Sequence, residues 1–138
     1  MNPVIERQNQ LVDNFSLFEE PDEKYEYLIS LSQQLPPYPE DKKDAEHQIK
    51  GCQSNVWFDM TQNNGYLHFK GVSDAIIVSG LIGLLLYVYN DAKPQDICQS
   101  DTTFMQQIGL DQQLSPTRKN GLHAMVQYIY QNAKAHCP

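Results

Sequence analysis

The residues Gly51-Cys52-Gln53-Ser54 stand where the chain is expected to turn, with polar side chains around the cysteine. A buried structural thiol usually lies within an apolar run. Cysteine reacts as its thiolate, and backbone N–H groups or a nearby cation can lower the thiol pKa from about 8.5. A turn after glycine presents several N–H groups, and Gln53, Ser54 and Asn55 add donors. Cys52 is therefore the candidate nucleophile, with an inert free thiol as the alternative on these residues alone.

The other residues that could do chemistry form no cluster in the sequence. The three cysteines contain no CxxC motif and match no zinc-ligand spacing. The histidines are scattered, with none at the i, i+4 spacing that places two imidazoles on one helix face, so no metal site is expected. Cys98 falls in a predicted helix, where packing explains a free thiol, and Cys137 lies next to the C-terminus, where disorder is the usual state.

Composition narrows the class of protein. Lys and Arg total 10 against 17 Asp and Glu, which gives a net charge of -7. Phosphate backbones repel such a chain, and it lacks the basic patch of a nucleic-acid-binding protein. The segment from Glu19 to Glu46 is strongly acidic, and it forms either a solvated surface or a face that steers a basic partner.

No targeting or membrane-spanning segment is expected. The start, MNPVIERQNQ, lacks a basic region followed by an apolar run, so it does not resemble a secretory signal. The most apolar stretch, Ala75 to Tyr89, is shorter than the about 20 residues that a membrane span needs. An odd number of cysteines argues against a disulfide framework. We therefore expect a cytoplasmic protein with reduced thiols.

Helices and strands must together position Cys52. The helices are predicted from apolar residues that recur at near-helical spacing. An amphipathic helix is predicted from Val4 to Phe18, and a second helix from Asp22, as its N-cap, to Leu35, where prolines follow. The stretch from Ala75 to Tyr89 is apolar on nearly every side, which predicts a central buried helix.

Ser73 or Asp74 is expected to cap that central helix, and a short helical piece is expected between Gln95 and Ile108. Ser115-Pro116 predicts the N-cap and first position of the last helix. The buried stripe of the last helix is predicted to be Leu122, Met125, Val126, Ile129 and Ala133.

The strands are predicted from the alternation of apolar and polar residues. Asn55 to Thr61 and Tyr66 to Lys70 alternate apolar and polar residues around Asn63-Asn64-Gly65, which predicts a β-hairpin. His47 to Lys50 is expected to add a third strand, joined through a tight turn that Gly51 permits. The predicted fold class is α+β: one domain over residues 1–138, with a small three-stranded antiparallel sheet and helices packed on one side.

The stretch from Gln48 to Trp57 resembles the GCQSxVW signature of the SufE family of sulfur-acceptor proteins, which includes CsdE. GCQS alone would be a weak motif, but further matches follow in the family's order along most of the chain. These are Glu23–Ile29 with Leu35-Pro36, Ser73–Ala75 with Ile77-Val78 and Gly80–Ile82, Pro94–Ile97, and Leu114–Arg118 with Gly121-Leu122 and Ala124-Met125. Val72, Cys98 and Cys137 depart from the pattern.

The resemblance implies a function. Members of the family take sulfane sulfur from a PLP-dependent cysteine desulfurase, SufS-like or CsdA-like, and hold it as a persulfide for iron–sulfur cluster assembly. The fold implied is the one shared with the IscU scaffold proteins. The persulfide cysteine maps onto Cys52, and the residues expected to support its loop or bind the partner are Gly51, Gln53, Ser54, Asp74 and Arg118.

The resemblance further implies a sulfur carrier and desulfurase activator rather than a stand-alone catalyst. No cofactor or metal is expected in this chain, because PLP belongs to the partner desulfurase, and a downstream iron–sulfur scaffold is the expected recipient. Neither nucleic acid nor membrane is an expected partner. The missing CxxC fits this function, since a second thiol nearby would attack the persulfide and release sulfide.

Two other classes stay open. An iron–sulfur scaffold would need several thiolates converging on one site. A cysteine-dependent hydrolase or peroxidase would need a base beside the thiol, and His47 is the nearest candidate in the sequence. For a sulfur carrier we also expect Cys52 to lie turned inward, shielded by Trp57 or the Ala75–Tyr89 helix, with backbone N–H groups offsetting the cost of desolvation.

Overall fold

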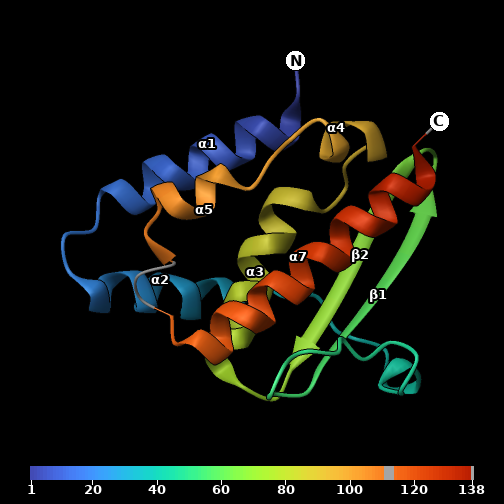
Figure 1. Ribbon diagram of the computed structural model, residues 1–138, viewed down its shortest axis with the longest axis horizontal. Helices are drawn as coiled ribbons and strands as arrows, with labels where there is room; N and C mark the ends of the chain where they lie inside the picture. The colour runs from blue at the N-terminus through green and yellow to red at the C-terminus, as the bar shows by residue number, and fades with distance from the viewer. Residues whose placement is uncertain (111–113, 138) are drawn as a thin grey trace.

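Helix α3 (Ile76–Tyr89) forms the centre of the computed structural model, which describes residues 1–110 and 114–137 (Figure 1). From Val78 to Tyr89 every residue is buried except Ser79 and Tyr87. A helix without a polar face has to be enclosed, and α3 is in contact with two N-terminal helices, the last helix and the sheet. The predicted central helix is confirmed.

The predicted cap of α3 is wrong. Ala75 holds the N-cap position, and no side chain caps the helix. The Ser73 hydroxyl instead accepts the Ala75 N–H at 3.2 Å, two residues along the chain. Asp74 does not cap the helix because its carboxylate accepts hydrogen bonds from Asn55, the residue before the first strand.

The two N-terminal helices are confirmed with adjusted ends. Helix α1 (Pro3–Ser16) is capped by Asn2, whose side chain accepts the Val4 N–H at 2.9 Å, and helix α2 (Pro21–Ser32) follows a short turn. The N-cap of α2 is Glu20 rather than Asp22, and the Glu20 N–H donates to the Glu23 carboxylate at 3.4 Å. A reciprocal Glu pair and a proline at the first position therefore start this helix, with Asp22 inside the first turn.

Helices α2 and α3 approach each other almost backbone to backbone. A Cβ atom added at Gly80 would lie 2.5 Å from the Leu28 carbonyl oxygen, and one added at Gly83 would lie 2.6 Å from the Leu31 carbonyl oxygen. Both distances are far below van der Waals contact, so only glycine permits this packing.

The β-hairpin is confirmed. Strands β1 (Val56–Asn63) and β2 (Tyr66–Ser73) pair antiparallel, from Val56 opposite Ser73 to Asn63 opposite Tyr66. Asn64 and Gly65 make the turn with positive φ angles of 54° and 83°, as a tight hairpin turn requires. One face of the hairpin is buried, and its Phe58 and Phe69 rings stack edge-on against Tyr128 of the last helix.

The predicted third strand is wrong, because the described residues contain a two-stranded sheet. Gln48 forms one isolated bridge with Trp57, flanked by hydrogen bonds from Ile49 N–H to the Val56 carbonyl (2.8 Å) and from Phe58 N–H to the His47 carbonyl (2.9 Å). An Asp44 side chain that accepts the His47 N–H turns the chain before this bridge, and Gly51 turns it after. Two close turns leave no length for a strand.

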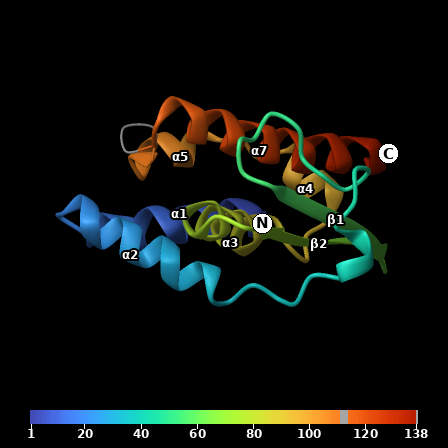
Figure 2. The same cartoon turned by 90° about the horizontal axis from the view of Figure 1, so that it is seen from below.

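The C-terminal half adds three helices in the described residues: α4 (Pro94–Cys98), α5 (Thr103–Gln107) and α7 (Pro116–His136). The predicted short helical piece is thus two helices. The N-cap of α7 is confirmed, since the Ser115 hydroxyl accepts the Arg118 N–H at 3.3 Å. The predicted stripe of α7 is buried in full, and Figure 2 shows α7 lying over the sheet.

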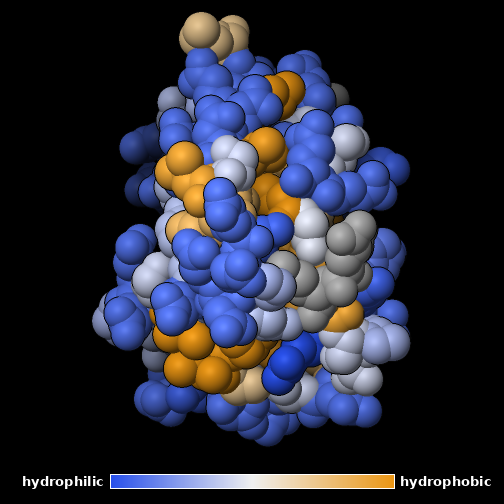
Figure 3. All heavy atoms as spheres, turned by 90° about the vertical axis from the view of Figure 1, so that its left-hand side faces the viewer, coloured by the Kyte–Doolittle hydropathy of each residue, from blue (hydrophilic) through white to orange (hydrophobic). Residues whose placement is uncertain are grey.

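The acidic segment is exposed to solvent. Glu19, Glu20, Asp22, Glu23 and Glu26 are all exposed at the start of α2 and in the turn before it. Hydrophilic residues cover most of the face seen in Figure 3, with smaller apolar patches between them. A short 3-10 turn, η1 (Glu40–Lys42), follows α2. In the part of the chain that is described, no helix is both long and apolar enough to cross a membrane.

The approach of α2 to α3 generates a stability prediction. Gly80→Ala should destabilise the fold by about 1–3 kcal/mol, because its methyl group would overlap the Leu28 carbonyl and force the helices apart. Urea unfolding followed by circular dichroism measures the change. The control Ile76→Ala, at a largely exposed position of the same helix, should alter stability by less than about 0.5 kcal/mol. Equal stability of the wild type and Gly80→Ala would contradict the backbone contact.

Candidate functional site

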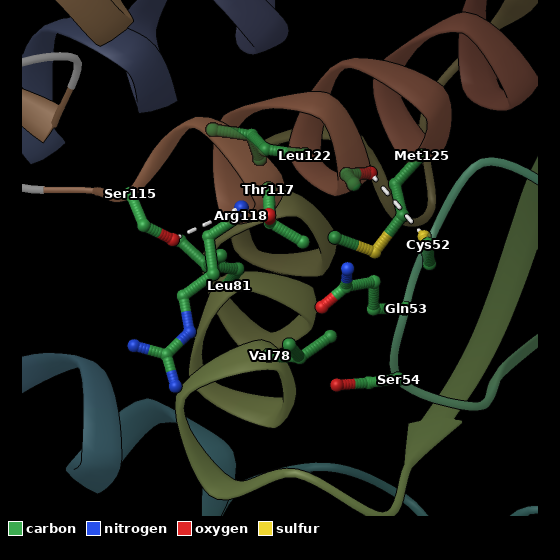
Figure 4. A pocket seen from close by; sticks show the side chains of 11 residues that line it. Cys52, Gln53, Ser54, Val78, Leu81, Ser115, Thr117, Arg118, Leu122 and Met125 are labelled. Atoms are coloured by element: carbon green, nitrogen blue, oxygen red, sulfur yellow. Dashed lines mark hydrogen bonds between the residues drawn. The ribbon is translucent and has the colours of Figure 1, made fainter.

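The loop between Gln48 and β1 delivers Cys52 to the surface of α7. Gly51 adopts φ +93°, a left-handed conformation that favours glycine, and it turns the chain back toward the helix. The next residue, Cys52, then lies over the first half of α7, where its thiol donates to the Gly121 carbonyl with an S···O distance of 3.7 Å (Figure 4). The predicted turn at Gly51 is confirmed.

Gly121 is what allows the thiol to come so close to α7. A Cβ atom added there would lie 3.3 Å from the Cys52 sulfur and 3.8 Å from its Cβ. The absence of a side chain at Gly121 therefore lets the Cys52 sulfur pack directly against the α7 backbone.

Both ends of the loop are fastened. On one side, the Ile49 N–H donates to the Val56 carbonyl at 2.8 Å. On the other side, the Asp74 carboxylate accepts two hydrogen bonds from Asn55, one from its backbone N–H at 3.2 Å and one from its side-chain amide at 3.0 Å. Gln48 also donates to the Asn55 side chain at 3.1 Å. Five residues lie between these anchors, and Cys52 in their middle makes the further contact with Gly121.

A pocket of about 370 Å³ opens beside the sulfur. Figure 4 shows that the loop forms one wall, α3 a second, and the first turns of α7 a third. The lining residues are Cys52, Gln53, Ser54, Val78, Leu81, Ser115, Thr117, Arg118, Gly121, Leu122 and Met125. The pocket has apolar side chains from the core and polar groups from the loop and the α7 N-terminus.

Arg118 lies across this pocket from Cys52. Its side chain starts near Ser115 and extends along the pocket with the guanidinium directed away from the sulfur (Figure 4). Arg118 is exposed, and it forms no ion pair with any residue that the structure describes. The cation is thus free to meet a group from outside the chain.

The electrostatic environment of Cys52 favours the neutral thiol. The side chain is half-buried, and burial raises the pKa of the Cys52 thiol because the thiolate would lose hydration. Its described hydrogen-bond partner is a carbonyl oxygen, which accepts from a thiol and repels a thiolate. Of the donors expected around the sulfur, Asn55 is engaged elsewhere, since its backbone N–H and its side-chain amide both bind Asp74. The resting site therefore holds a shielded thiol.

The structure brings most of the predicted site residues together. Gly51, Gln53 and Ser54 lie beside Cys52, Arg118 lines the same pocket, and Asp74 acts one step away by holding Asn55. Trp57, proposed as a shield, is not among the lining residues, and α7 takes that place together with α3. Sequence reasoning missed Gly121 as the contact of Cys52, although a glycine inside a helical pattern signals a close approach.

His47, the candidate base, does not line the Cys52 pocket. Its imidazole pairs with the Asp44 carboxylate at 2.7 Å and lies 3.7 Å from Asp59, which is itself bound by Lys42 at 3.0 Å. Asp44, Glu46 and His47 form the one group of possible metal ligands in the described residues. That group is on the surface, contains no thiol, and has its imidazole already hydrogen-bonded.

The Asp74 anchor generates a prediction about thiol accessibility. In Asp74→Ala the loop loses two hydrogen bonds at one end, so Cys52 should leave its contact with Gly121 more often. We expect its alkylation by iodoacetamide to become about 3–10-fold faster, which corresponds to about 1 kcal/mol of lost anchoring. Peptide mass spectrometry after timed quenching gives the rate at Cys52 alone. Asp13→Ala, an exposed carboxylate on α1, serves as the control and should leave the rate unchanged.

Comparison with solved structures finds the same fold in a protein from Thermus thermophilus. A hypothetical protein from Thermus thermophilus, whose structure was determined in solution, superimposes with a TM-score of 0.80. The alignment covers 99% of this chain and 98% of that chain, at 18% sequence identity. At such identity the similarity establishes the shared fold alone.

Comparison with protein families is more specific. The family described as "SufE: Fe-S metabolism associated domain" matches residues 9–133, a range that contains Cys52, both loop anchors and every residue of the pocket. The match spans nearly the whole chain and includes the segment whose GCQS sequence holds the half-buried thiol over Gly121. The chain therefore belongs to the SufE family, whose domain is associated with iron–sulfur metabolism.

Proposed function

We propose that the protein accepts sulfur as a persulfide on Cys52 from a PLP-dependent cysteine desulfurase, stimulates that desulfurase, and passes the sulfur on for iron–sulfur cluster assembly. The observation that carries the proposal is the placement of Cys52 at the middle of a loop fastened at both ends, over a pocket, in a chain of the SufE family. One exchangeable thiol on a tethered segment is what a carrier between two other proteins requires.

The transfer is a thiol–persulfide exchange without a net redox change. The Cys52 thiolate attacks the outer sulfur of a persulfide on the desulfurase, the S–S bond of that persulfide breaks, and the desulfurase cysteine leaves as a thiolate. Cys52 then carries the outer sulfur as a persulfide, and the proton released by the Cys52 thiol goes to solvent or to the leaving thiolate. Donation to the next acceptor repeats the same step in reverse roles.

The resting geometry supports storage rather than attack. Burial and the Gly121 carbonyl both favour the protonated thiol, so Cys52 reacts slowly while it lies against α7. A pocket of about 370 Å³ beside the sulfur leaves room for a second sulfur atom shielded from small thiols. Reaction then requires the loop to swing outward, and a partner favours that conformer by making contacts available only there.

The partner proposed is a SufS-like or CsdA-like desulfurase, and the recipient is a downstream iron–sulfur scaffold. PLP would belong to the desulfurase, and this chain would act as a carrier and activator without a cofactor of its own. Arg118, unpaired among the described residues at the rim of the Cys52 pocket, is a candidate contact for an acidic or carbonyl group of the partner. A reducing compartment such as the cytoplasm would keep Cys52 available as a thiol.

The two alternative classes are less well supported by the geometry. A scaffold needs several converging thiolates, but Cys137 follows α7 sixteen residues after Gly121, or about 24 Å along the helix. Cys98 lies beside Cys137 and is equally remote. A hydrolase or peroxidase needs a base next to the thiol, and the His47 imidazole is held by Asp44 instead.

The central prediction concerns the three thiols. Cys52→Ser should abolish both the stimulation of a matched desulfurase and the uptake of labelled sulfur from cysteine, because the accepting atom is lost. Cys98→Ala and Cys137→Ser are the matched controls and should keep most of both activities. Sulfide release and gel fluorography of the labelled protein measure the two effects. Labelled sulfur bound by Cys52→Ser as well as by the wild type would overturn the assignment.

A second prediction concerns partner binding. Arg118→Ala should weaken the affinity for the desulfurase about tenfold, which corresponds to about 1.4 kcal/mol, because a charge contact at the pocket rim is lost. The circular dichroism and unfolding of the variant should match the wild type, since the guanidinium supports no described contact. Lys119→Ala, one position along α7 and outside this pocket, is the control. Calorimetric affinities that are equal for Arg118→Ala and the wild type would show that Arg118 is a merely solvated cation.

A further inference from the structure

Two thiols that play no part in the Cys52 site lie against each other at the opposite end of α7. Cys98 is the last residue of α4, and Cys137 directly follows α7. Their sulfur atoms are 2.7 Å apart, although the residues are 39 positions apart in the chain. A disulfide bond measures about 2.05 Å, so a shift of well under an ångström would bring the two sulfurs to bonding distance. Both are free thiols in the structure.

The packing of α4 against α7 holds the two thiols together without help from sulfur. Ile97, next to Cys98, and Ala133, in the last turn of α7, are both fully buried. The Tyr130 hydroxyl of α7 is hydrogen-bonded at 2.9 Å to the Tyr89 hydroxyl of α3 and at 2.9 Å to the Ser100 hydroxyl just after α4. The Cys137 N–H also donates to the Lys134 carbonyl at 3.3 Å, which keeps Cys137 close to the helix end.

We propose that Cys98 and Cys137 are a redox modification site, which closes to a reversible intramolecular disulfide on exposure to low-molecular-weight disulfides. The proposal does not depend on the sulfur transfer assigned to Cys52. It rests on the proximity of two free thiols that the hydrophobic core fixes in place, with Cys98 open to solvent.

The closing reaction consumes one small disulfide, RSSR. The thiolate of one cysteine attacks RSSR, forms a mixed disulfide and releases RS⁻. The thiolate of the other cysteine then attacks the protein sulfur of that mixed disulfide, which forms the Cys98–Cys137 bond and releases the second RS⁻. The cysteine pair loses two electrons and two protons, and RSSR becomes two RSH. An excess of RSH runs the same steps backward.

The chemical environment of Cys98 sets the pace of this reaction. Partial desolvation of its sulfur, the hydrogen bond to Cys137 and the charge on Cys137 together raise the pKa of the exposed Cys98 thiol to about 11, while the charge of Lys134 acts in the opposite direction. Little Cys98 thiolate is therefore present at neutral pH. The site should respond to sustained oxidation, and its closure should be faster in mildly alkaline solution.

Separation along α7 keeps the pair from exchanging with Cys52. Cys52 rests on Gly121, and the rise of an α-helix puts Cys137 about 24 Å farther along α7. A bridge between the pair and Cys52 would require α7 to unfold. Oxidation should accordingly close one intramolecular bond and leave Cys52 as the single alkylatable thiol.

The test uses the purified full chain incubated with oxidised glutathione, alkylated with iodoacetamide and digested under non-reducing conditions. We expect a cross-linked Cys98–Cys137 peptide, an intact mass lower by two hydrogen atoms before alkylation, and a carbamidomethyl group on Cys52 after it. The closed loop restricts the unfolded chain, so Tm should rise by about 10 °C and return to its initial value with dithiothreitol.

Matched variants make the result decisive. Cys98→Ser and Cys137→Ser should each lose both the cross-link and the Tm increase, whereas Cys52→Ser should keep both. Glutathione adducts on Cys98 or Cys137 with no cross-linked peptide would overturn the proposal. So would a bridge that includes Cys52, or a Cys98–Cys137 peptide found only in a covalent dimer on a non-reducing gel.

Discussion

The contact between α2 and α3 is the constraint on which the rest of the structure depends. Gly80 and Gly83 let the two helix backbones meet at Leu28 and Leu31 with no side chain between them. Because α3 is apolar on nearly all sides, it has to be buried, and α1, α2, α7 and β2 pack against it. The same helix carries Val78 and Leu81 into the Cys52 pocket, so the wall that shields the sulfur is positioned from inside the core.

The parts of this fold that depend on local chemistry could be predicted from the sequence. Ser115-Pro116 starts α7, Asn64-Gly65 turns the hairpin, and the apolar stripe of α7 is buried, since each signal lies within a few residues of its effect. The prediction of a third strand over His47–Lys50 was wrong, because so short a stretch of sequence does not show how far the backbone stays extended. An Asp44 side chain and Gly51 each bend the backbone within the same few residues, and one bridge is all that fits between them.

The same distinction between local signals and distant contacts applies to the Cys52 site. Cys52 and its turn were visible in four consecutive residues, and family resemblance added Asp74 and Arg118. What the thiol touches was not visible, because Gly121 is separated from it by 69 positions and becomes its neighbour through the packing of α7 on the core. For the same reason Cys98 and Cys137 looked like a packed thiol and a disordered end, whereas tertiary packing brings their sulfurs within 2.7 Å.

The two anchors of the Cys52 loop also set a reach. The chain between Ile49 and Asn55 is fixed at both ends, and Cys52 stands at its midpoint, three residues from each anchor. Three residues of fully extended chain span about 10 Å, so the Cys52 backbone can travel no farther than that from its base while the hairpin stays intact. Under the proposed function, a protein that exchanges sulfur with this one must present its reacting atom within that depth, in an opening wide enough to admit the loop. The length of the loop therefore limits the depth of the active sites that Cys52 can enter.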